Sequence, residues 1–366
     1  MDQPLSQTYL IPFCDDSTLI FATAMRRLLI EAGVKVDLAL YEPEAVLSAR
    51  QITAYLPQGD FGMLTADGLK SAAASGQYEA LVTSRVFEPL KTLLELPAFK
   101  AMGRRAQIIG FLGGLDFFPE RGLRNRKHCD AVYLFPKDTA DRFEVDMLAR
   151  QDGTAPPLVG FGHPVFLMPP PQSAEVGKAA GANGDIYFFT QAISPSTKRA
   201  RLHILDMLIA IARANPKRNV WIKLRHLPNE NTDHLHQERF SYPELLDVQG
   251  RKRPENLKLT ACTMAEAVRT AAVGITCTST AAVDLLREGV PTMVYLDYVD
   301  NYVDPLAPPM RSLFHKSGLI KPLEDILRLR HSAPNPEWIA NMFCHRDLAK
   351  DVVKTVARLR AAQSAA

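Results

Sequence analysis

The sequence predicts an α/β protein made of two halves, each with a parallel sheet covered by helices. Short apolar, β-branched runs alternate with amphipathic segments along almost all of the 366 residues, a pattern typical of parallel α/β layering. Between Gly153 and Gly184 the composition changes to proline, glycine and alanine, which indicates a linker. The length is also sufficient for two hydrophobic cores.

The first half is expected to alternate strands with helices. Its predicted strands are Thr8–Cys14, Val34–Leu40, Tyr78–Thr83, Ala106–Leu112 and Asp130–Phe135. Its predicted helices are Ser17–Glu31, Glu44–Gln51, Ala66–Ser75, Glu88–Phe99 and Lys137–Arg150. This alternation of strands and helices indicates parallel α/β layering.

The second half repeats this alternation. Its predicted strands are Asp185–Thr190, Asn219–Leu224, Val273–Cys277 and the apolar run opened by Pro291. Its predicted helices are Ser196–Ala214, Thr263–Ala272, the segment after Thr280 that ends at Gly289, and Pro322–Arg330. Thr263 and Glu266 have the spacing of a capping box. The amphipathic stretch Glu337–Ala362 closes the chain.

A cluster of hydroxyl side chains follows the strand Val273–Cys277. Thr278, Ser279 and Thr280 stand between this strand and the next helix. Ligands of open parallel sheets collect at the carboxyl ends of strands, and a helix N-terminus attracts phosphate. The segment therefore predicts a phosphate site. The alternative is that Ser279 or Thr280 only caps the helix.

A second cluster ends the strand Asn219–Leu224, where the chain reads IKLRHLP. Lys223, Arg225 and His226 fall within four residues at this predicted carboxyl edge. Two cations and an imidazole can neutralise and protonate a leaving phosphate. Alternation places Lys223 and Arg225 on one face of the strand. The alternative is an edge strand with solvated cations, but its apolar flanks favour a central strand.

Composition excludes several other classes of protein. The sequence contains neither GxGxxG nor a Walker motif, and its five cysteines and nine histidines form no zinc pattern. The net charge of +3 is too small to indicate nucleic acid binding. The basic clusters Arg104–Arg105 and Arg121–Lys127 are expected to be solvated surface, and the alternative is that they face an anionic acceptor. No apolar run reaches membrane-spanning length and no signal peptide is recognised, so a cytoplasmic protein is expected.

The layout from Asp15-Asp16-Ser17 through IKLRH to TCTST resembles a family of GT-B glycosyltransferases. This resemblance implies two Rossmann-like domains facing each other across a cleft, with a C-terminal helix that crosses back to the first domain. It predicts an acceptor domain over 1–165, a donor domain over 184–334 and the returning helix within 335–366. Retaining GT-B enzymes of the commonest type carry two glutamates eight positions apart. Here Glu288 is kept and Thr280 takes the earlier place, which leaves the stereochemical outcome open.

The strand end containing His226 is similar to the K-x-H-P motif of bacterial sialyltransferases and capsule-type 3-deoxy-octulosonate (Kdo) transferases, although Leu227 interrupts it. In those enzymes the histidine contacts the phosphate of a CMP-activated donor. Gln191, in FFTQAISP, resembles their glutamine–proline motif, again with altered spacing. The resemblance implies that Gln191, Lys223, Arg225, His226, Thr278–Thr280 and Glu288 bind the donor.

GT-B enzymes often place the acceptor's base in the loop after the first strand. Asp16 is the first candidate for this base, Asp15 the second, and Asp116 or Glu120 the third. Each also has a structural alternative as a cap or turn residue. The cations of the donor site can take the electrostatic role of a metal, so neither a metal nor another cofactor is expected.

These features predict a glycosyltransferase that uses a nucleotide sugar, with a CMP-ulosonic acid such as sialic acid, pseudaminic acid or Kdo as the favoured donor. The expected acceptor is a glycan or a lipid-linked glycan of a cell-surface polysaccharide, which leaves peripheral membrane association open. The alternatives are a nucleotide-sugar 2-epimerase of similar architecture and a non-catalytic sugar-nucleotide-binding protein. The sequence does not determine the oligomeric state.

Overall fold

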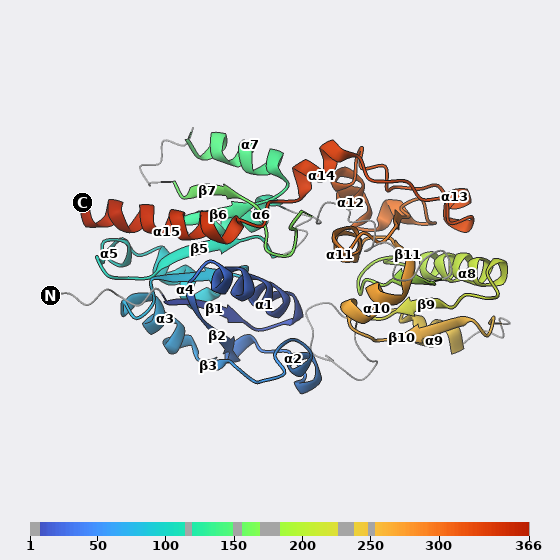
Figure 1. Ribbon diagram of the computed structural model, residues 1–366, viewed down its shortest axis with the longest axis horizontal. Helices are drawn as coiled ribbons and strands as arrows, with labels where there is room; N and C mark the ends of the chain where they lie inside the picture. The colour runs from blue at the N-terminus through green and yellow to red at the C-terminus, as the bar shows by residue number, and fades with distance from the viewer. Residues whose placement is uncertain are drawn as a thin grey trace. The chain divides into compact units, whose positions relative to one another are not determined.

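A computed structural model describes residues 8–113, 119–148, 156–168, 184–225, 238–247 and 253–365 (Figure 1). The chain divides into two compact units: unit 1 comprises Met1–Met168 and Ala340–Ala366, and unit 2 comprises Pro169–Ile339. Each unit holds one sheet whose paired strands are parallel. The predicted class of two Rossmann-like α/β halves is therefore confirmed.

The sheet of unit 1 has seven strands in the order β3-β2-β1-β4-β5-β6-β7. They are β1 (Thr8–Phe13), β2 (Lys35–Tyr41), β3 (Gly62–Leu64), β4 (Ala80–Thr83), β5 (Gln107–Phe111), β6 (Ala131–Leu134) and β7 (Leu158–Phe161). The helices are α1 (Asp16–Glu31), α2 (Ala49–Tyr55), α3 (Ala66–Ala74), α4 (Glu88–Leu94), α5 (Pro97–Lys100), α6 (Pro119–Arg126), α7 (Lys137–Leu148) and α15 (Leu348–Ala365).

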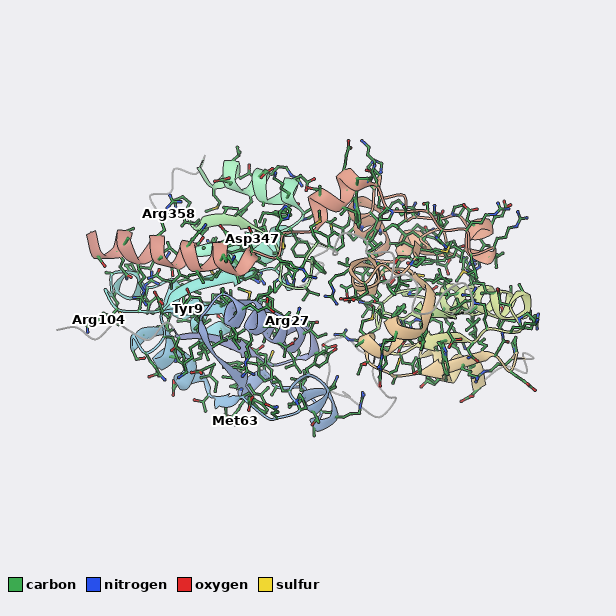
Figure 2. All side chains as sticks on the ribbon, in the orientation of Figure 1. Tyr9, Arg27, Met63, Arg104, Asp347 and Arg358 are labelled. Carbon is green, nitrogen blue, oxygen red and sulfur yellow. The ribbon has the colours of Figure 1, made fainter. Side chains whose placement is uncertain are left out.

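The two outer strands of this sheet are the ones that the sequence pattern does not reveal. Both β3 and β7 are short and lie at the edges of the sheet, and β3 exposes Met63 by 60% (Figure 2). Partly solvated edge strands lack the continuous apolar run of the central strands. Because β7 pairs with β6, the first part of the predicted linker is in fact a strand of unit 1.

The last helix of the chain completes the core of unit 1. Val352 and Val356 of α15 are fully buried, in the same cluster as Ile11 and Phe13 of β1. The hydroxyl of Tyr133 in β6 donates to Asp351 of α15 over 2.7 Å. The predicted return of the C-terminal helix to the first half is thus confirmed.

The sheet of unit 2 has five strands in the order β10-β9-β8-β11-β12. They are β8 (Asp185–Phe189), β9 (Val220–Lys223), β10 (Leu257–Thr260), β11 (Ala271–Thr276) and β12 (Thr292–Val294). The helices are α8 (Lys198–Ala214), α9 (Tyr242–Asp247), α10 (Met264–Thr270), α11 (Ala281–Arg287), α12 (Ala307–Leu313) and α13 (Leu323–Leu327). Helix α14 (Pro336–Met342) begins in unit 2 and ends in unit 1. The capping box predicted for α10 is present, since Glu266 N–H donates to Thr263 Oγ1 and Thr263 N–H to Glu266 Oε2.

A close approach of α11 to β11 fixes where the hydroxyl loop lies. A Cβ atom built on Gly274 would lie 2.3 Å from Cδ1 of Leu285. Only glycine leaves room for this leucine, which is fully buried against the sheet. The strand and the helix are therefore held together on either side of the loop Cys277–Thr280.

Candidate functional site

The order of strands in unit 2 gathers loops from distant parts of the sequence. Strand β8 lies between β9 and β11, so the chain leaves β8 toward one side and later returns to the other. Such a switch point is where open α/β sheets bind ligands, at the carboxyl ends of the strands. The loops after Phe189 and Thr276 begin there, joined by a 3.0 Å hydrogen bond from Thr276 Oγ1 to Phe189 O.

The hydroxyl loop at this edge contains one buried group without a partner. Thr278 is 1% exposed, and its hydroxyl has no hydrogen bond within the described part of unit 2. A buried hydroxyl without a partner costs about 1–3 kcal/mol, so such groups usually mark a strained or ligand-binding position. Thr278 is the polar group of this loop that a ligand would satisfy.

The other two hydroxyls differ from each other. Ser279 Oγ accepts a 3.3 Å hydrogen bond from Ala281 N–H, so this serine helps to cap α11, as its structural alternative proposed. Thr280 occupies the cap position, but its side chain makes no capping hydrogen bond. Capping therefore accounts for Ser279 and leaves Thr280 unexplained.

The start of α11 offers hydroxyls rather than N–H groups. The N–H group of Ala282 donates to Ser279 O over 3.3 Å and that of Val283 to Thr280 O over 2.9 Å. With Ala281 N–H bonded to Ser279, the first-turn donors of this seven-residue helix are engaged within the loop. An anion here would depend on side-chain hydroxyls and nearby cations.

Strand β9 brings its cation to the same edge. It lies between β8 and β10, so the prediction of a central strand is confirmed. Lys223 O accepts 3.1 Å hydrogen bonds from both N–H and Oγ1 of Thr190. Leu224 joins the core on the α8 side, and the charge of Lys223 contributes to lowering the pKa values of Glu266 in α10 and Asp284 in α11. Arg225 is partly buried, and His226 lies outside the described residues.

Gln191 follows β8 and shapes its own loop. Its Oε1 atom accepts from Ile193 N–H over 2.6 Å and from Ser194 N–H over 3.1 Å. Because both neighbours are donors, the contacting side-chain atom must be the amide oxygen. The amide nitrogen is then the group that Gln191 can direct toward a ligand.

Asp284 belongs to this neighbourhood, although the sequence did not single it out. It lies in the first turn of α11 and is partly buried. Burial raises its pKa to about 6, while the charges of Arg287 and Lys223 lower it and that of Glu288 raises it further. A carboxylate between Ala282, Val283, Leu285 and Leu286 breaks the apolar pattern of the helix. That break is the signal by which the sequence could have identified it.

Glu288, in contrast, lies away from the hydroxyl loop. It is the residue that ends α11, and a seven-residue helix places it about 10 Å along the axis from the loop. Its carboxylate accepts a 3.0 Å hydrogen bond from Nε of Arg287. The spacing of eight residues therefore does not bring Glu288 to the carboxyl edge, and Asp284 is the acidic residue of α11 nearer to it.

Unit 1 has its own switch point, with β1 between β2 and β4. Asp15 caps α1 here: its Oδ1 accepts from Thr18 N–H over 2.8 Å, and its Oδ2 pairs with Arg85 after β4 at 3.3 Å. Arg85 also pairs with Glu44 after β2. The structural alternative for Asp15 thus describes its contacts well.

Asp16 is the first residue of α1 and is partly buried. Its Oδ1 accepts a 3.0 Å hydrogen bond from Ser17 N–H. Asp116 and the side chain of Glu120 lie outside the described residues. Since Asp15 is the candidate that caps α1 and pairs with Arg85, Asp16 stays the first candidate for the base.

A buried histidine in unit 1 is unsuited to be the base. His163 Nδ1 accepts from Val165 N–H at 3.3 Å, so the proton is on Nε2, which donates to Leu112 O at 3.1 Å. Burial lowers the pKa of this imidazole to about 3. His163 is therefore a neutral core residue whose two nitrogens are both engaged.

Two arginines of the predicted surface clusters are buried. Arg104 is exposed (Figure 2), but Arg105 is 5% exposed and forms a bidentate 2.7 Å pair with Asp130. Arg126 is also buried and donates to the backbone oxygens of Ser84 and Phe111. The interpretation of these residues as solvated surface is wrong, because each guanidinium satisfies groups inside the fold.

Neither a metal-binding cluster nor a membrane-spanning helix is present among the described residues. They contain no group of three or more His, Cys, Asp or Glu side chains that could hold a metal ion. None of the helices in the same residues is long and apolar enough to cross a membrane.

Comparison with known proteins places this geometry in a wider context. The model of the family described as "Putative glycosyltransferase (DUF6716)" matches residues 14–359. A search of curated proteins found no match.

Solved structures share the architecture at low identity. A "putative UDP-N-acetylglucosamine 2-epimerase" from Listeria monocytogenes has a TM-score of 0.61 at 11% identity, over 96% of this chain and 95% of that one. The UDP-GlcNAc 2-epimerase from Neisseria meningitidis bound to UDP-GlcNAc has a TM-score of 0.55 at 12% identity, over 96% of this chain and 100% of that one. The S. aureus MnaA–UDP structure has a TM-score of 0.54 at 9% identity, over 95% of each chain. At these identities the similarity shows the fold alone.

Proposed function

We infer that this chain, which belongs to the family described as "Putative glycosyltransferase (DUF6716)", transfers a sugar from a nucleotide donor bound at the switch point of unit 2. The observation that carries the proposal is the buried Thr278 hydroxyl without a partner among the described residues, at the sheet edge where Lys223 ends β9 and Gln191 follows β8. Buried polar groups are normally hydrogen-bonded. A ligand oxygen at this place would supply the missing bond.

The chemistry of the surrounding groups favours a phosphate. Thr280 offers a hydroxyl without a capping bond, Gln191 an amide N–H₂, and Lys223 a positive charge. Hydroxyl and amide donors beside a cation match the oxygens of a phosphate, and charge-assisted bonds are the stronger ones. Arg225 and His226 follow Lys223 in the sequence and are assigned to the departing phosphate. These cations would stabilise the leaving charge without a metal.

Proton removal is assigned to unit 1. For an inverting transfer, the acceptor oxygen bonds to the anomeric carbon as the bond from that carbon to the phosphate oxygen breaks. The electron pair leaves with the phosphate, and Asp16 takes the acceptor proton as general base. Asp15 is unsuited to this role because it caps α1 and pairs with Arg85. With Asp15 set aside, Asp116 or Glu120 is the next candidate for the base.

For the donor we favour a CMP-activated ulosonic acid, on the resemblance of IKLRHLP to the strand end of sialyltransferases and Kdo transferases. The acceptor would be a glycan or a lipid-linked glycan. UDP-sugars are the main alternative, because the solved structures of similar fold include UDP-GlcNAc epimerases.

A thermal-shift panel of CMP, UDP, GDP and dTDP tests the donor site. A ligand that binds only the folded state at 100 times its Kd stabilises it by about 2.7 kcal/mol, so the cognate nucleotide should raise Tm measurably. A shift with CMP supports the ulosonic acid donor, and a shift with UDP alone rejects it. No shift with any nucleotide would contradict the donor site itself.

Incubation with the matching nucleotide sugar then separates a transferase from its rivals. A transferase should at most hydrolyse the donor slowly when no acceptor is present. Conversion to an epimeric sugar without an acceptor would identify an epimerase. Tight nucleotide binding with neither hydrolysis nor transfer to any glycan acceptor tested would favour a binding protein.

A further inference from the structure

A buried arginine connects the loops at the switch point of unit 2. Arg201 lies in the first turns of α8 and is 1% exposed. Its Nε donates to Pro195 O over 2.8 Å, and its Nη2 donates to Ala192 O over 2.6 Å and to Gln191 O over 3.1 Å. One guanidinium thus holds three carbonyl oxygens of the loop that follows β8.

The same guanidinium reaches the loop that follows β9. Its Nη1 forms an ion pair with Glu238, which stands between β9 and α9. The carboxylate neutralises a charge that would be costly to bury alone, and the guanidinium lies 5.3 Å from the centre of the Tyr242 ring. Only the fixed fork of an arginine can serve all these partners together.

An aspartate binds the hydrogen-bond donor groups of the same loop. Asp304 is 2% exposed, and its Oδ2 accepts from Ser194 Oγ over 2.9 Å and from Ser196 N–H over 3.0 Å. Carbonyl groups of the loop are therefore bound by a cation, and its N–H and O–H groups by an anion. Together these contacts give the loop one shape without any ligand, which lowers the cost of binding one.

We propose that Arg201 is the positioning residue of the nucleotide site, which it serves by fixing the loop on which Gln191 stands. It holds the backbone oxygens of Gln191 and Ala192, while Gln191 Oε1 closes the turn onto Ile193 and Ser194. Because the backbone oxygen and the side-chain amide oxygen of Gln191 are both held, the position of its amide nitrogen is fixed. This inference rests on the proposed function, because the ligand that Gln191 meets is the donor phosphate.

Arg105 of unit 1 is a matched control. It is also almost fully buried, pairs with a carboxylate (Asp130) and lies 5.0 Å from the centre of an aromatic ring (Phe99). Its backbone partner is Ala106 O, at the amino end of β5. Ligand-binding loops of parallel sheets start at the other end of the strands. Arg105 therefore has the same structural role as Arg201, but it does not lie at the carboxyl edge of a sheet, where the ligand-binding loops begin.

The experiment compares Arg201→Lys with Arg105→Lys in the full chain. The ligand is whichever of CMP, UDP, GDP and dTDP gives the largest thermal shift with the wild-type protein. Both variants should lose thermal stability. Calorimetry should show nucleotide affinity about tenfold or more weaker for Arg201→Lys, since preorganisation is lost, and within about twofold of wild type for Arg105→Lys. Glu238→Gln, which keeps the guanidinium in place but removes its counter-charge, should weaken binding in the same direction to a smaller extent.

A double variant tests the route through Gln191. If Arg201 acts through this loop, Gln191→Ala in the Arg201→Lys background should cost little further affinity, because coupled residues are not additive. Full additivity, or equal affinity in the two lysine variants, would overturn the positioning role. Should Arg201→Lys not fold, an unchanged affinity in Glu238→Gln would overturn it instead. A wild-type protein that binds none of the four nucleotides would reject the proposed function rather than this inference alone.

Discussion

The two switch points of this protein differ in how well their polar side chains are paired. At the unit 1 edge, Asp15 binds its own helix and Arg85, and Arg85 also binds Glu44. At the unit 2 edge, Thr278 is buried without a partner in the described residues, and burial raises the pKa of Asp284 to about 6. The first edge is largely satisfied by its own chain.

This difference teaches where a ligand is needed. Polar groups that are buried without a partner or with a shifted pKa carry a free-energy cost, and such groups gather at functional sites. At its carboxyl edge, unit 2 carries that cost on the buried Thr278 hydroxyl, which would recover it by donating a hydrogen bond to a phosphate oxygen. In the proposed mechanism, unit 1 only has to present a base, and this role requires no buried polar group without a partner.

The largest expected effect separates the two edges by function. Asp16→Asn should lower turnover by about 10²–10⁴-fold, as loss of a general base usually does, while nucleotide affinity stays unchanged. Asp67→Asn is the matched control, because Asp67 is also an acidic residue in the first turn of its helix, α3, but pairs only with Lys70 on the surface. Steady-state rates beside calorimetry make the comparison. Near-normal turnover in Asp16→Asn with loss in Asp116→Asn would move the base to the other loop.

The next effect contrasts two threonines of unit 2. Thr278→Val should weaken nucleotide binding by about 1–3 kcal/mol, yet leave thermal stability unchanged or raised, because the buried hydroxyl has no partner to lose among the residues that the structure describes. Thr276→Val should instead lower the stability of the protein by about 1–2 kcal/mol, because Thr276 Oγ1 binds Phe189 O and Ser279 N–H. Denaturant unfolding and calorimetry measure both. A Thr278→Val protein with full nucleotide affinity would contradict the donor site.

The third prediction uses the pH dependence of stability. The pKa of Asp284 is raised from its ordinary value to about 6 in the folded state. The folded state then binds more protons than the unfolded one between the two values, so this group's contribution to stability falls as pH rises through that window. Asp284→Asn removes the buried charge and should stabilise the apoprotein at pH 8 by on the order of 1–2 kcal/mol. Urea unfolding at pH 8 and pH 4 should show this gain at the higher pH only, and an equal difference at both would refute the assignment.

The smallest effect concerns the satisfied edge. Asp15→Ala removes the cap of α1 and the pair with Arg85, and should cost about 1–2 kcal/mol of stability. Nucleotide affinity should not change, because the lost contacts are local to unit 1. Chemical denaturation and calorimetry again suffice. A clear loss of nucleotide affinity would mean that the first edge takes part in donor binding.

The sequence predicts the central strands well because their apolar runs are continuous. It also places Thr278–Thr280, Gln191 and Lys223 at strand ends, which the structure gathers at one sheet edge. It does not reveal β3 and β7, whose partly exposed residues give no such pattern. Strand order is a tertiary property, so the switch points themselves appear only in the structure.

Arg105 and Arg126 were expected at the surface because charged side chains are rarely buried unless they are paired. Their partners, such as Asp130 and the backbone oxygen of Ser84, lie 25 and 42 residues away in sequence, so no local pattern identifies them. Glu288 was assigned from the resemblance to retaining GT-B enzymes, whereas the short α11 leaves it at the far end of the helix.

Hydrogen exchange with and without the nucleotide that binds most tightly tests the contrast between the two edges most directly. The loops are compared within one sample, so differences in stability do not intervene. Bound nucleotide should slow amide exchange in peptides covering residues 190–197 and 276–284 of unit 2, with little change in residues 14–18 and 84–88 of unit 1. Protection confined to the unit 1 peptides would contradict a donor site at the unit 2 switch point.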